Sequence, residues 1–233
     1  MGGYDVVLFD LDNTLSDIHW SMREALPALL NEFGIECSAE DAARYLATFN
    51  EVATPLWHRL ERGEMGLDEL NDERFRLFVE RAGIDADPAV LAPAYLGWLG
   101  TSGGLIDGAR ELLDDLHGDV RMGLITNGYS EVQRPRLLKF DLEKYFEAIV
   151  VSGEIGHAKP HAEFFDVAFE QLGHPDPSSV LVVGDSLTSD IAGGANAGAA
   201  TCWYNPAGSP RPDAPRIDHV VTQLDAVAPI ARG

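Results

Sequence analysis

Two aspartates follow directly after an apolar run near the start of the chain. The run Val6–Phe9 leads into Asp10 and Asp12, and Thr14 comes two residues further on. Because alternate residues of an extended chain point to the same side, the two carboxylates are expected to lie close together. Close carboxylates repel each other, and both stay ionised only when a cation, a lysine or a hydrogen-bond donor lies between them. The sequence therefore predicts such a partner at this point.

Three later apolar runs are also followed by polar groups. These groups are Thr126 and Asn127, then Lys159, then Asp185 with Asp190 beyond it. Open α/β sheets bind ligands at the carboxyl ends of their parallel strands, so all these groups are expected to converge. Carboxylate oxygens favour Mg²⁺, which is commonly shared with a substrate phosphate. We therefore predict a phosphoryl-transfer site. The groups expected to bind the phosphoryl oxygens are Thr126, Lys159 and backbone N–H groups near Asn127. One carboxylate would attack phosphorus, and another would transfer the proton of the leaving group.

The elements that must position these groups alternate between strand and helix in most of the chain. The predicted strands are Val6–Phe9, Met122–Thr126, Ala148–Val151, Val180–Val183, Thr201–Tyr204 and His219–Val221. Helical patterns lie between the strands from residue 105 onward, which is typical of a parallel sheet built from βαβ units. The predicted fold class is α/β, with a Rossmann-like, three-layer parallel-sheet core.

A helical block interrupts this core after its first strand. Its predicted helices are Trp20–Phe33, Ala39–Phe49, Thr54–Arg62, Leu67–Ala82 and Pro88–Leu99. Glycines stand at several of the helix ends, and Asp87-Pro88 resembles an N-cap followed by a first-turn proline. The predicted division is therefore a core of residues 1–16 and 101–233, with an all-helical insertion at 17–100.

Composition narrows the class of partner. The chain has 233 residues, of which 17 are basic and 38 acidic, giving a net charge of −21. So much negative charge opposes binding to a polynucleotide or to an anionic membrane surface, and favours a small-molecule substrate. The N-terminal residues lack the basic and apolar regions of a signal peptide, and the two cysteines are far apart, so a cytoplasmic protein is expected. Monomer and homodimer both stay open.

The four groups of residues resemble the ordered motifs of the haloacid dehalogenase-like hydrolases. The matching segments are Asp10–Thr14, Thr126–Gly128, Lys159-Pro160 and Gly184–Ser186 with Asp190. The helical insertion is similar to the cap domain of that superfamily. The resemblance implies a Mg²⁺-dependent phosphatase that hydrolyses phosphomonoesters through an aspartyl-phosphate intermediate.

The same resemblance implies a function for each motif residue. Asp10 would be the nucleophile, and Asp12 the general acid that later activates water. Asp10, the backbone carbonyl of Asp12 and Asp185 would bind Mg²⁺, supported by Asp190. The residues expected to bind phosphate are Thr126, Asn127 and Lys159, the last of which is also counted among the catalytic residues.

A narrower resemblance is to the noncanonical pyrimidine 5′-nucleotidases. It is carried by Ser152–His161, Gly184–Gly198 and Thr201–Asn205, and in the insertion by Pro55–Trp57 and Arg74-Phe75. It implies a pyrimidine nucleoside 5′-monophosphate as substrate and makes Trp57 and Arg74 candidate substrate contacts, although aromatic residues at helical spacing are usually core. Ser16 departs from the aromatic residue expected after the first motif.

Other functions stay open on the sequence alone. The nearest alternative is a sugar-phosphate or phosphoglycolate phosphatase. A phosphomutase would use the same nucleophile, and a 2-haloacid dehalogenase would attack carbon without a metal. A catalytically silent binding domain is a further alternative from outside the enzymes.

Overall fold

The computed structural model describes residues 2–233, which form two compact units. The first, here called the α/β unit, contains the described residues up to Asp17 with Leu105–Asn127 and Phe140–Gly233. The second, the helical unit, contains Ile18–Gly104 and Gly128–Lys139. The sequence-based division instead places 128–139 in the core. This segment groups with the helical unit because its helix α6 (Ser130–Lys139) packs against helix α4 (Pro88–Thr101).

The α/β unit is built on a six-stranded sheet with the order β3-β2-β1-β4-β5-β6, and every neighbouring pair is parallel. The strands are β1 (Val6–Phe9), β2 (Arg121–Thr126), β3 (Ala148–Val151), β4 (Val180–Gly184), β5 (Ala200–Tyr204) and β6 (His219–Val221). The α/β fold with a parallel sheet, predicted from the alternation of strand and helix, is confirmed.

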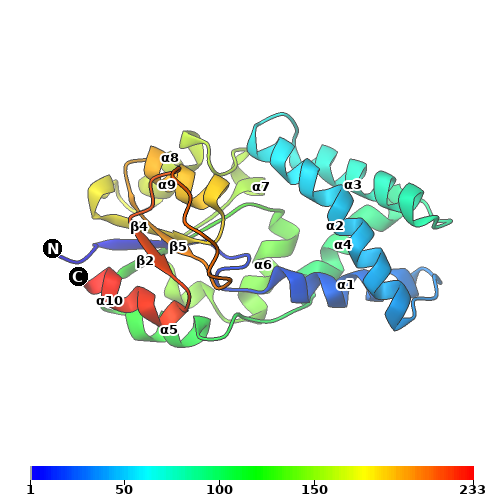
Figure 1. The fold of residues 1–233 in the computed structure, drawn as a ribbon, viewed down its shortest axis with the longest axis horizontal. Helices are drawn as coiled ribbons and strands as arrows, with labels where there is room; N and C mark the ends of the chain where they lie inside the picture. The colour runs from blue at the N-terminus through cyan, green and yellow to red at the C-terminus, as the bar shows by residue number, and fades with distance from the viewer. Residues whose placement is uncertain (1) are drawn as a thin grey trace. The chain divides into compact units, whose positions relative to one another are not determined.

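Helices cover both faces of this sheet (Figure 1), with α8 and α9 on one side and α5 and α10 on the other. The helices of the unit are α5 (Ala109–Leu116), α7 (Ser152–Ile155), α8 (Ala162–Gln171), α9 (Ala192–Asn196) and α10 (Val227–Arg232). Its shorter helical turns are η1 (Glu143–Tyr145), η2 (Pro177–Ser179), η3 (Leu187–Ile191) and η4 (Leu224–Ala226). Leu8 packs in an apolar cluster with Phe165 of α8, while its neighbours Val7 and Phe9 are fully buried at 0% exposure. A strand buried on both faces explains why β1 is a continuous apolar run.

The helical unit contains α1 (Ile18–Glu32), α2 (Ala39–Glu61), α3 (Leu67–Ala82), α4 and α6. Aromatic rings fill its core, and Phe49 of α2 contacts Phe75, Phe78 and Tyr95 at centroid distances of 5.0–5.4 Å. The predicted absence of strands in this insertion agrees with the structure over residues 18–104.

Helix α2 differs from the sequence-based expectation of two helices, which was wrong. It runs unbroken through Pro55, which lies on its exposed side. Proline removes one backbone hydrogen bond and costs a helix interior about 3 kcal/mol. The buried side of the same turns includes Val52, Leu56 and Leu60, and their packing offsets that cost.

Within residues 2–233, the helices are all too short or too polar for any of them to cross a bilayer.

Candidate active site

Asp10 follows β1, beside the point where the strand order of the sheet reverses. Strand β1 is flanked by β2 on one side and β4 on the other, with Phe9 in register with Leu124 and with Val183. The backbone N–H of Asp10 continues the second ladder by donating to the Val183 carbonyl at 2.9 Å. The carboxyl ends of strands at such a switch point form the usual ligand crevice of an open α/β sheet.

A tight loop follows Asp10. The N–H groups of Leu15 and Ser16 both donate to the carbonyl of Leu11, at 3.0 and 2.8 Å, and Asn13 has a φ of 62°. Asparagine is among the few non-glycine residues that adopt this left-handed conformation readily. The sequence Asp-Asn-Thr therefore suits a chain that must turn sharply while keeping two carboxylates near the strand end.

Lys159 lies at the centre of the buried charges. Its Nζ donates to Oδ1 of Asp10 at 2.7 Å, to Oδ1 of Asp190 at 2.7 Å and to the carbonyl of Ile125 at 2.8 Å. The side chain is only 1% exposed, so all three ammonium protons are used inside the protein. The structure thus brings together groups that stand 149 and 31 residues apart in the chain.

Asn127 holds the backbone of Lys159 in place. Its side-chain amide donates to the Lys159 carbonyl at 3.0 Å, and its Oδ1 accepts from the Lys159 N–H at 2.8 Å. Because this pair of bonds occupies both ends of the amide, the side chain positions Lys159. Phosphate binding at Asn127 stays a prediction for the backbone N–H groups around it.

Asp190 is brought to the cluster by an unusual turn. It lies in η3, a π-helical turn. Its Oδ1 accepts from Lys159, while its Oδ2 accepts the N–H of Ser186 at 3.0 Å. A π-helical turn often marks a functional site. The helix N-cap in this turn is Ser186, whose Oγ accepts from the N–H of Ser189, so capping is not the function of Asp190.

Two neighbouring residues that the sequence analysis did not single out as site residues shape this region. A Cβ on Gly184 would lie 2.2 Å from Oδ2 of Asp190, so only glycine leaves room for that carboxylate. Trp203 of β5 donates its indole N–H to the backbone carbonyl of Asp185 at 2.9 Å. The glycine before Asp185 was a visible signal, whereas nothing in the sequence singled out Trp203 for this contact.

Crowding of carboxylates shifts the pKa values of the cluster. Burial raises the pKa of Asp10 well above its usual range, and Asp190 adds to the shift against the opposing effect of Lys159. Burial, followed by repulsion from Asp190, raises the pKa of Asp185 to about 7. Burial opposes the charged form of Lys159, yet Asp10 and Asp190 outweigh it and raise the pKa of the ammonium. The cluster is therefore short of positive charge.

A divalent cation would supply the positive charge that this cluster lacks. Asp10, Asp185 and Asp190 each offer a carboxylate oxygen, and these oxygens lie within 4.8 Å of one another. When all three carboxylates are ionised, their negative charge exceeds the single positive charge of the Lys159 ammonium by two. Oδ2 of Asp10 is buried and has no hydrogen-bond partner among residues 2–233, so it is free to bind a ligand. The donors are hard oxygens, which suit Mg²⁺.

The two threonines of the predicted site are both fully buried. Thr126 is the last residue of β2 and is 0% exposed. Thr14 is also 0% exposed, and its Oγ1 has no hydrogen-bond partner within the described chain. Asp12 is half-buried and acts electrostatically on Asp185, whose pKa it helps to raise. The α/β unit thus gathers the predicted core residues at one edge of its sheet.

Arg74 and Trp57, the candidate substrate contacts, belong to the helical unit. Arg74 is only 3% exposed, and its guanidinium lies 5.0 Å from the ring centroid of Phe49 and 5.3 Å from that of Tyr95. Its Nη2 donates to Oδ1 of Asn71 at 2.5 Å. Trp57 is half-buried. Substrate contact by either residue stays a prediction, and Arg74 has a packing function inside its own unit.

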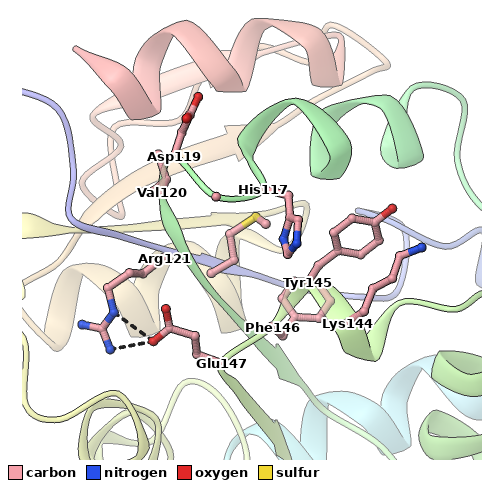
Figure 2. Close-up of a pocket in the computed structure, with 10 residues that line it drawn as sticks. His117, Asp119, Val120, Arg121, Lys144, Tyr145, Phe146 and Glu147 are labelled. Atoms are coloured by element: carbon pink, nitrogen blue, oxygen red, sulfur yellow. Dashed lines mark hydrogen bonds and ion pairs between the residues drawn. The ribbon is translucent and has the colours of Figure 1, made fainter.

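A separate cavity of about 270 Å³ lies at the other edge of the sheet. Figure 2 shows the rings of His117, Tyr145 and Phe146 around it, with the ion pair of Arg121 and Glu147 at one side. Arg121 begins β2, so this cavity lies at the amino ends of the strands. It is lined by none of the predicted site residues.

The parallel sheet and the charge cluster at its carboxyl edge agree with the family comparison. Residues 4–198 match the family of haloacid dehalogenase-like hydrolases, and the chain belongs to this family of enzymes. The family resemblance drawn from the four motifs is therefore confirmed.

Two curated relatives and one solved structure cover most of the chain. This chain is 38% identical over 202 residues to pyrimidine 5′-nucleotidase YjjG of Escherichia coli, and the comparison covers 87% of this chain and 86% of the relative. It is 35% identical over 204 residues to pyrimidine 5′-nucleotidase PynA of Streptococcus pneumoniae, with 87% and 84% covered. The magnesium-bound crystal structure of the putative HAD-hydrolase YfnB from Bacillus subtilis superposes with a TM-score of 0.89 at 32% identity, covering 98% and 99% of the two chains.

Proposed function

We propose that this protein is a Mg²⁺-dependent phosphatase that hydrolyses pyrimidine nucleoside 5′-monophosphates through an aspartyl-phosphate on Asp10. The observation that carries the proposal is how the two oxygens of the Asp10 carboxylate are hydrogen-bonded. One of its oxygens accepts from Lys159 at 2.7 Å, and the other is buried without a hydrogen-bond partner in the described chain. A carboxylate held by one oxygen and open at the other is oriented for nucleophilic attack.

The chain's own residues supply the two halves of the reaction. Oδ2 of Asp10 attacks phosphorus, the bond from phosphorus to the ester oxygen breaks, and Asp12 gives a proton to the departing alcohol. Asp12 then takes a proton from water as the water oxygen attacks phosphorus. The bond between phosphorus and Asp10 breaks, inorganic phosphate leaves, and both carboxylates return to their starting states.

Lys159 and Thr126 are proposed to bind the phosphoryl oxygens, for which Lys159 gives up one of its three hydrogen bonds inside the protein. Lys159 also fixes the orientation of Asp10, and Asn127 in turn fixes the backbone of Lys159. Asp10, the backbone carbonyl of Asp12 and Asp185 would hold the metal ion, with Asp190 supporting the site. When bound, Mg²⁺ neutralises charge on the transferring phosphoryl group.

The proposed substrate rests on two similarities. Two curated relatives, at 38% and 35% identity, are named pyrimidine 5′-nucleotidases, and each comparison covers 87% of this chain. The high negative charge of the chain also favours a small substrate over a polynucleotide.

A substrate panel tests this proposal. Purified protein is supplied with Mg²⁺ and with UMP, dTMP, purine monophosphates, sugar phosphates or phosphoglycolate, and inorganic phosphate release is measured. We expect the highest kcat/KM for UMP or dTMP. A preference for sugar phosphates or phosphoglycolate would overturn the nucleotidase assignment and keep the phosphatase. Phosphoryl transfer within the substrate without phosphate release would indicate a mutase.

Incubation with 2-haloacids in the presence of EDTA tests the carbon-attacking alternative. We expect no halide release. Halide release without metal, together with no phosphate release from any ester in Mg²⁺, would overturn the phosphatase as a whole. No reaction in either assay would favour a binding domain.

A further inference from the structure

One peptide group beside the carboxylate cluster is held at both ends. It joins Asp185 to Ser186, directly after β4. Its carbonyl oxygen, which belongs to Asp185, accepts the indole N–H of Trp203 at 2.9 Å. Its N–H, which belongs to Ser186, donates to Oδ2 of Asp190 at 3.0 Å. Because a peptide group is planar, hydrogen bonds at its two ends fix the orientation of the whole group, and with it the backbone that carries the Asp185 carboxylate.

The indole of Trp203 is itself held in place by packing. Trp203 lies on β5, in register with Gly184, and is only 6% exposed. Its ring belongs to an apolar cluster with Ile191 of η3 and with Ile217, both of which are buried. The indole N–H can donate but not accept, and it is the only polar group of this side chain. The packing therefore commits that group to the Asp185 carbonyl.

The same hydrogen bonds continue into the charge cluster. Asp190 accepts from Ser186 through Oδ2 and from Lys159 through Oδ1. Lys159 in turn donates to Asp10. A series of hydrogen bonds thus runs from an uncharged indole, through one peptide group, to the proposed nucleophile. Hydrogen bonds joined in this way strengthen one another in a buried environment and hold a single geometry.

We infer that Trp203 is a positioning residue for the metal site, whose indole N–H raises the affinity for Mg²⁺ by fixing the backbone of Asp185. This inference rests on the metal site of the proposed function. Groups that hydrogen-bond to metal ligands orient those ligands, and their loss typically weakens metal binding by about 10- to 100-fold. Here the hydrogen bond is to the main chain of the ligand residue, so it restricts that residue and leaves both carboxylate oxygens available.

Calorimetric titration of Mg²⁺ into the full chain tests the proposal. Trp203→Phe keeps a ring in the apolar cluster and removes the N–H, so we expect its dissociation constant for Mg²⁺ to rise at least about tenfold. Tyr145→Phe is the matched control, because it also removes a hydrogen-bonding atom from a buried ring of the α/β unit, namely the hydroxyl that donates to Asp114. Its dissociation constant should stay within about twofold of the wild-type value.

Melting temperatures without metal separate positioning from a structural function, once circular dichroism has established that both variants are folded. If the indole N–H serves stability alone, Trp203→Phe melts at a lower temperature and binds Mg²⁺ as tightly as the wild type, which would overturn this inference alone. Equal weakening of Mg²⁺ binding by Tyr145→Phe would overturn it as well. A wild-type chain that binds no Mg²⁺ would overturn the proposed metal site and this inference with it.

A measurement on the wild-type chain does not depend on how Trp203→Phe folds. The four tryptophans give four indole N–H signals by nuclear magnetic resonance, and Trp20, Trp57 and Trp98 lie in the helical unit. Replacing each of these three in turn by phenylalanine identifies its signal and leaves the fourth as that of Trp203. We expect the Trp203 signal to shift as Mg²⁺ is added, with the dissociation constant that calorimetry gives. A Trp203 signal that does not move while calorimetry shows binding would overturn the proposal.

Discussion

The α/β unit buries its charged groups against one another, whereas the helical unit buries a charged group among aromatic rings. Lys159 contacts two carboxylates, and the cluster still carries excess negative charge. Arg74 has three ring centroids within 5.0–5.6 Å and one amide partner, and the causes that shift its pKa include no carboxylate. Burial lowers the pKa of this guanidinium.

The difference separates two uses of a buried charge. Cation–π contacts and one hydrogen bond offset part of the cost of desolvating Arg74, and nothing in that arrangement calls for another ion. The α/β cluster holds carboxylates at distances where they destabilise one another, which is costly unless a ligand relieves it. Such repulsion between buried carboxylates is typical of a functional site.

Removing the proposed nucleophile has the largest expected effect on activity. Asp10→Asn keeps an oxygen to accept from Lys159 but cannot form the acyl phosphate, so we expect kcat to fall by at least about 10⁴-fold. Phosphate release measures this, and the metal-free melting temperature should be unchanged or higher because one repelling charge is gone. Asp5→Asn, an exposed position before β1, is the control and should be fully active. Activity within tenfold of wild type in Asp10→Asn would contradict the mechanism.

Removing the central cation tests the charge cluster itself. Lys159→Met leaves its carboxylate neighbours buried without their ammonium, so we expect a loss of about 3–5 kcal/mol in the free energy of unfolding near pH 7. Urea denaturation measures the loss, which should shrink at acid pH as the carboxylates take up protons. Lys144→Met, which breaks an exposed ion pair with Asp141, should cost far less stability than Lys159→Met. Equal losses in the two variants would mean that burial of the cluster does not matter.

The shifted carboxyl of Asp185 predicts a pH dependence. Its pKa of about 7 lies above the ordinary value of 3.8, so the folded metal-free protein binds more protons than the unfolded chain between these two pH values. This group's contribution to stability is therefore present below pH 3.8 and is lost as the pH rises towards 7.

Mg²⁺ binding should show the reverse dependence. Protons compete with the metal for Asp185, so the dissociation constant for Mg²⁺ is expected to rise up to about tenfold per pH unit below 7. Calorimetric titration measures it, with proton release on binding as a second signal. Asp185→Asn should abolish both signals. A dissociation constant that is flat between pH 5 and 8 would exclude Asp185 as a titrating ligand.

The smallest effect is expected in the helical unit. Arg74→Met loses the cation–π contacts but no longer buries a charge, so we expect a loss of about 1 kcal/mol in the free energy of unfolding. Both kcat and KM for the preferred nucleotide should stay within about threefold of wild type. Arg81→Met, at an exposed position of the same helix, is the control. Unchanged stability with a large increase in KM would place Arg74 in substrate binding instead.

The sequence predicted the sheet well because its strands are short, apolar and followed by polar groups. The predicted bounds of Val6–Phe9, Ala148–Val151 and His219–Val221 agree with the structure, as do those of the helix Leu67–Ala82. The unbroken helix through Pro55 was missed, because the packing that offsets a proline depends on contacts with distant residues.

Convergence of Asp10, Lys159, Asp185 and Asp190 was predicted, because parallel strands place their carboxyl ends at one edge. The exclusion of any side chain at Gly184 and the contact from Trp203 to Asp185 were not foreseen, since both depend on distances between elements. The hydrogen bonds from the Asn127 amide to the backbone of Lys159 were not foreseen, and phosphate binding near Asn127 stays a prediction. The convergence of these residues could be predicted from the sequence because each follows a predicted strand, whereas contacts that depend on tertiary distances could not.

The contact of Lys159 with Asp10 joins residues 149 positions apart. Contacts between such remote parts of a chain form slowly, because a large loop must close before any interaction rewards it. During refolding, helices are therefore expected to appear well before catalytic competence. Recovery of enzymatic turnover would then report a late step of refolding, the assembly of the whole sheet. Recovery of ellipticity and turnover at the same rate would show instead that the strands are ordered much earlier.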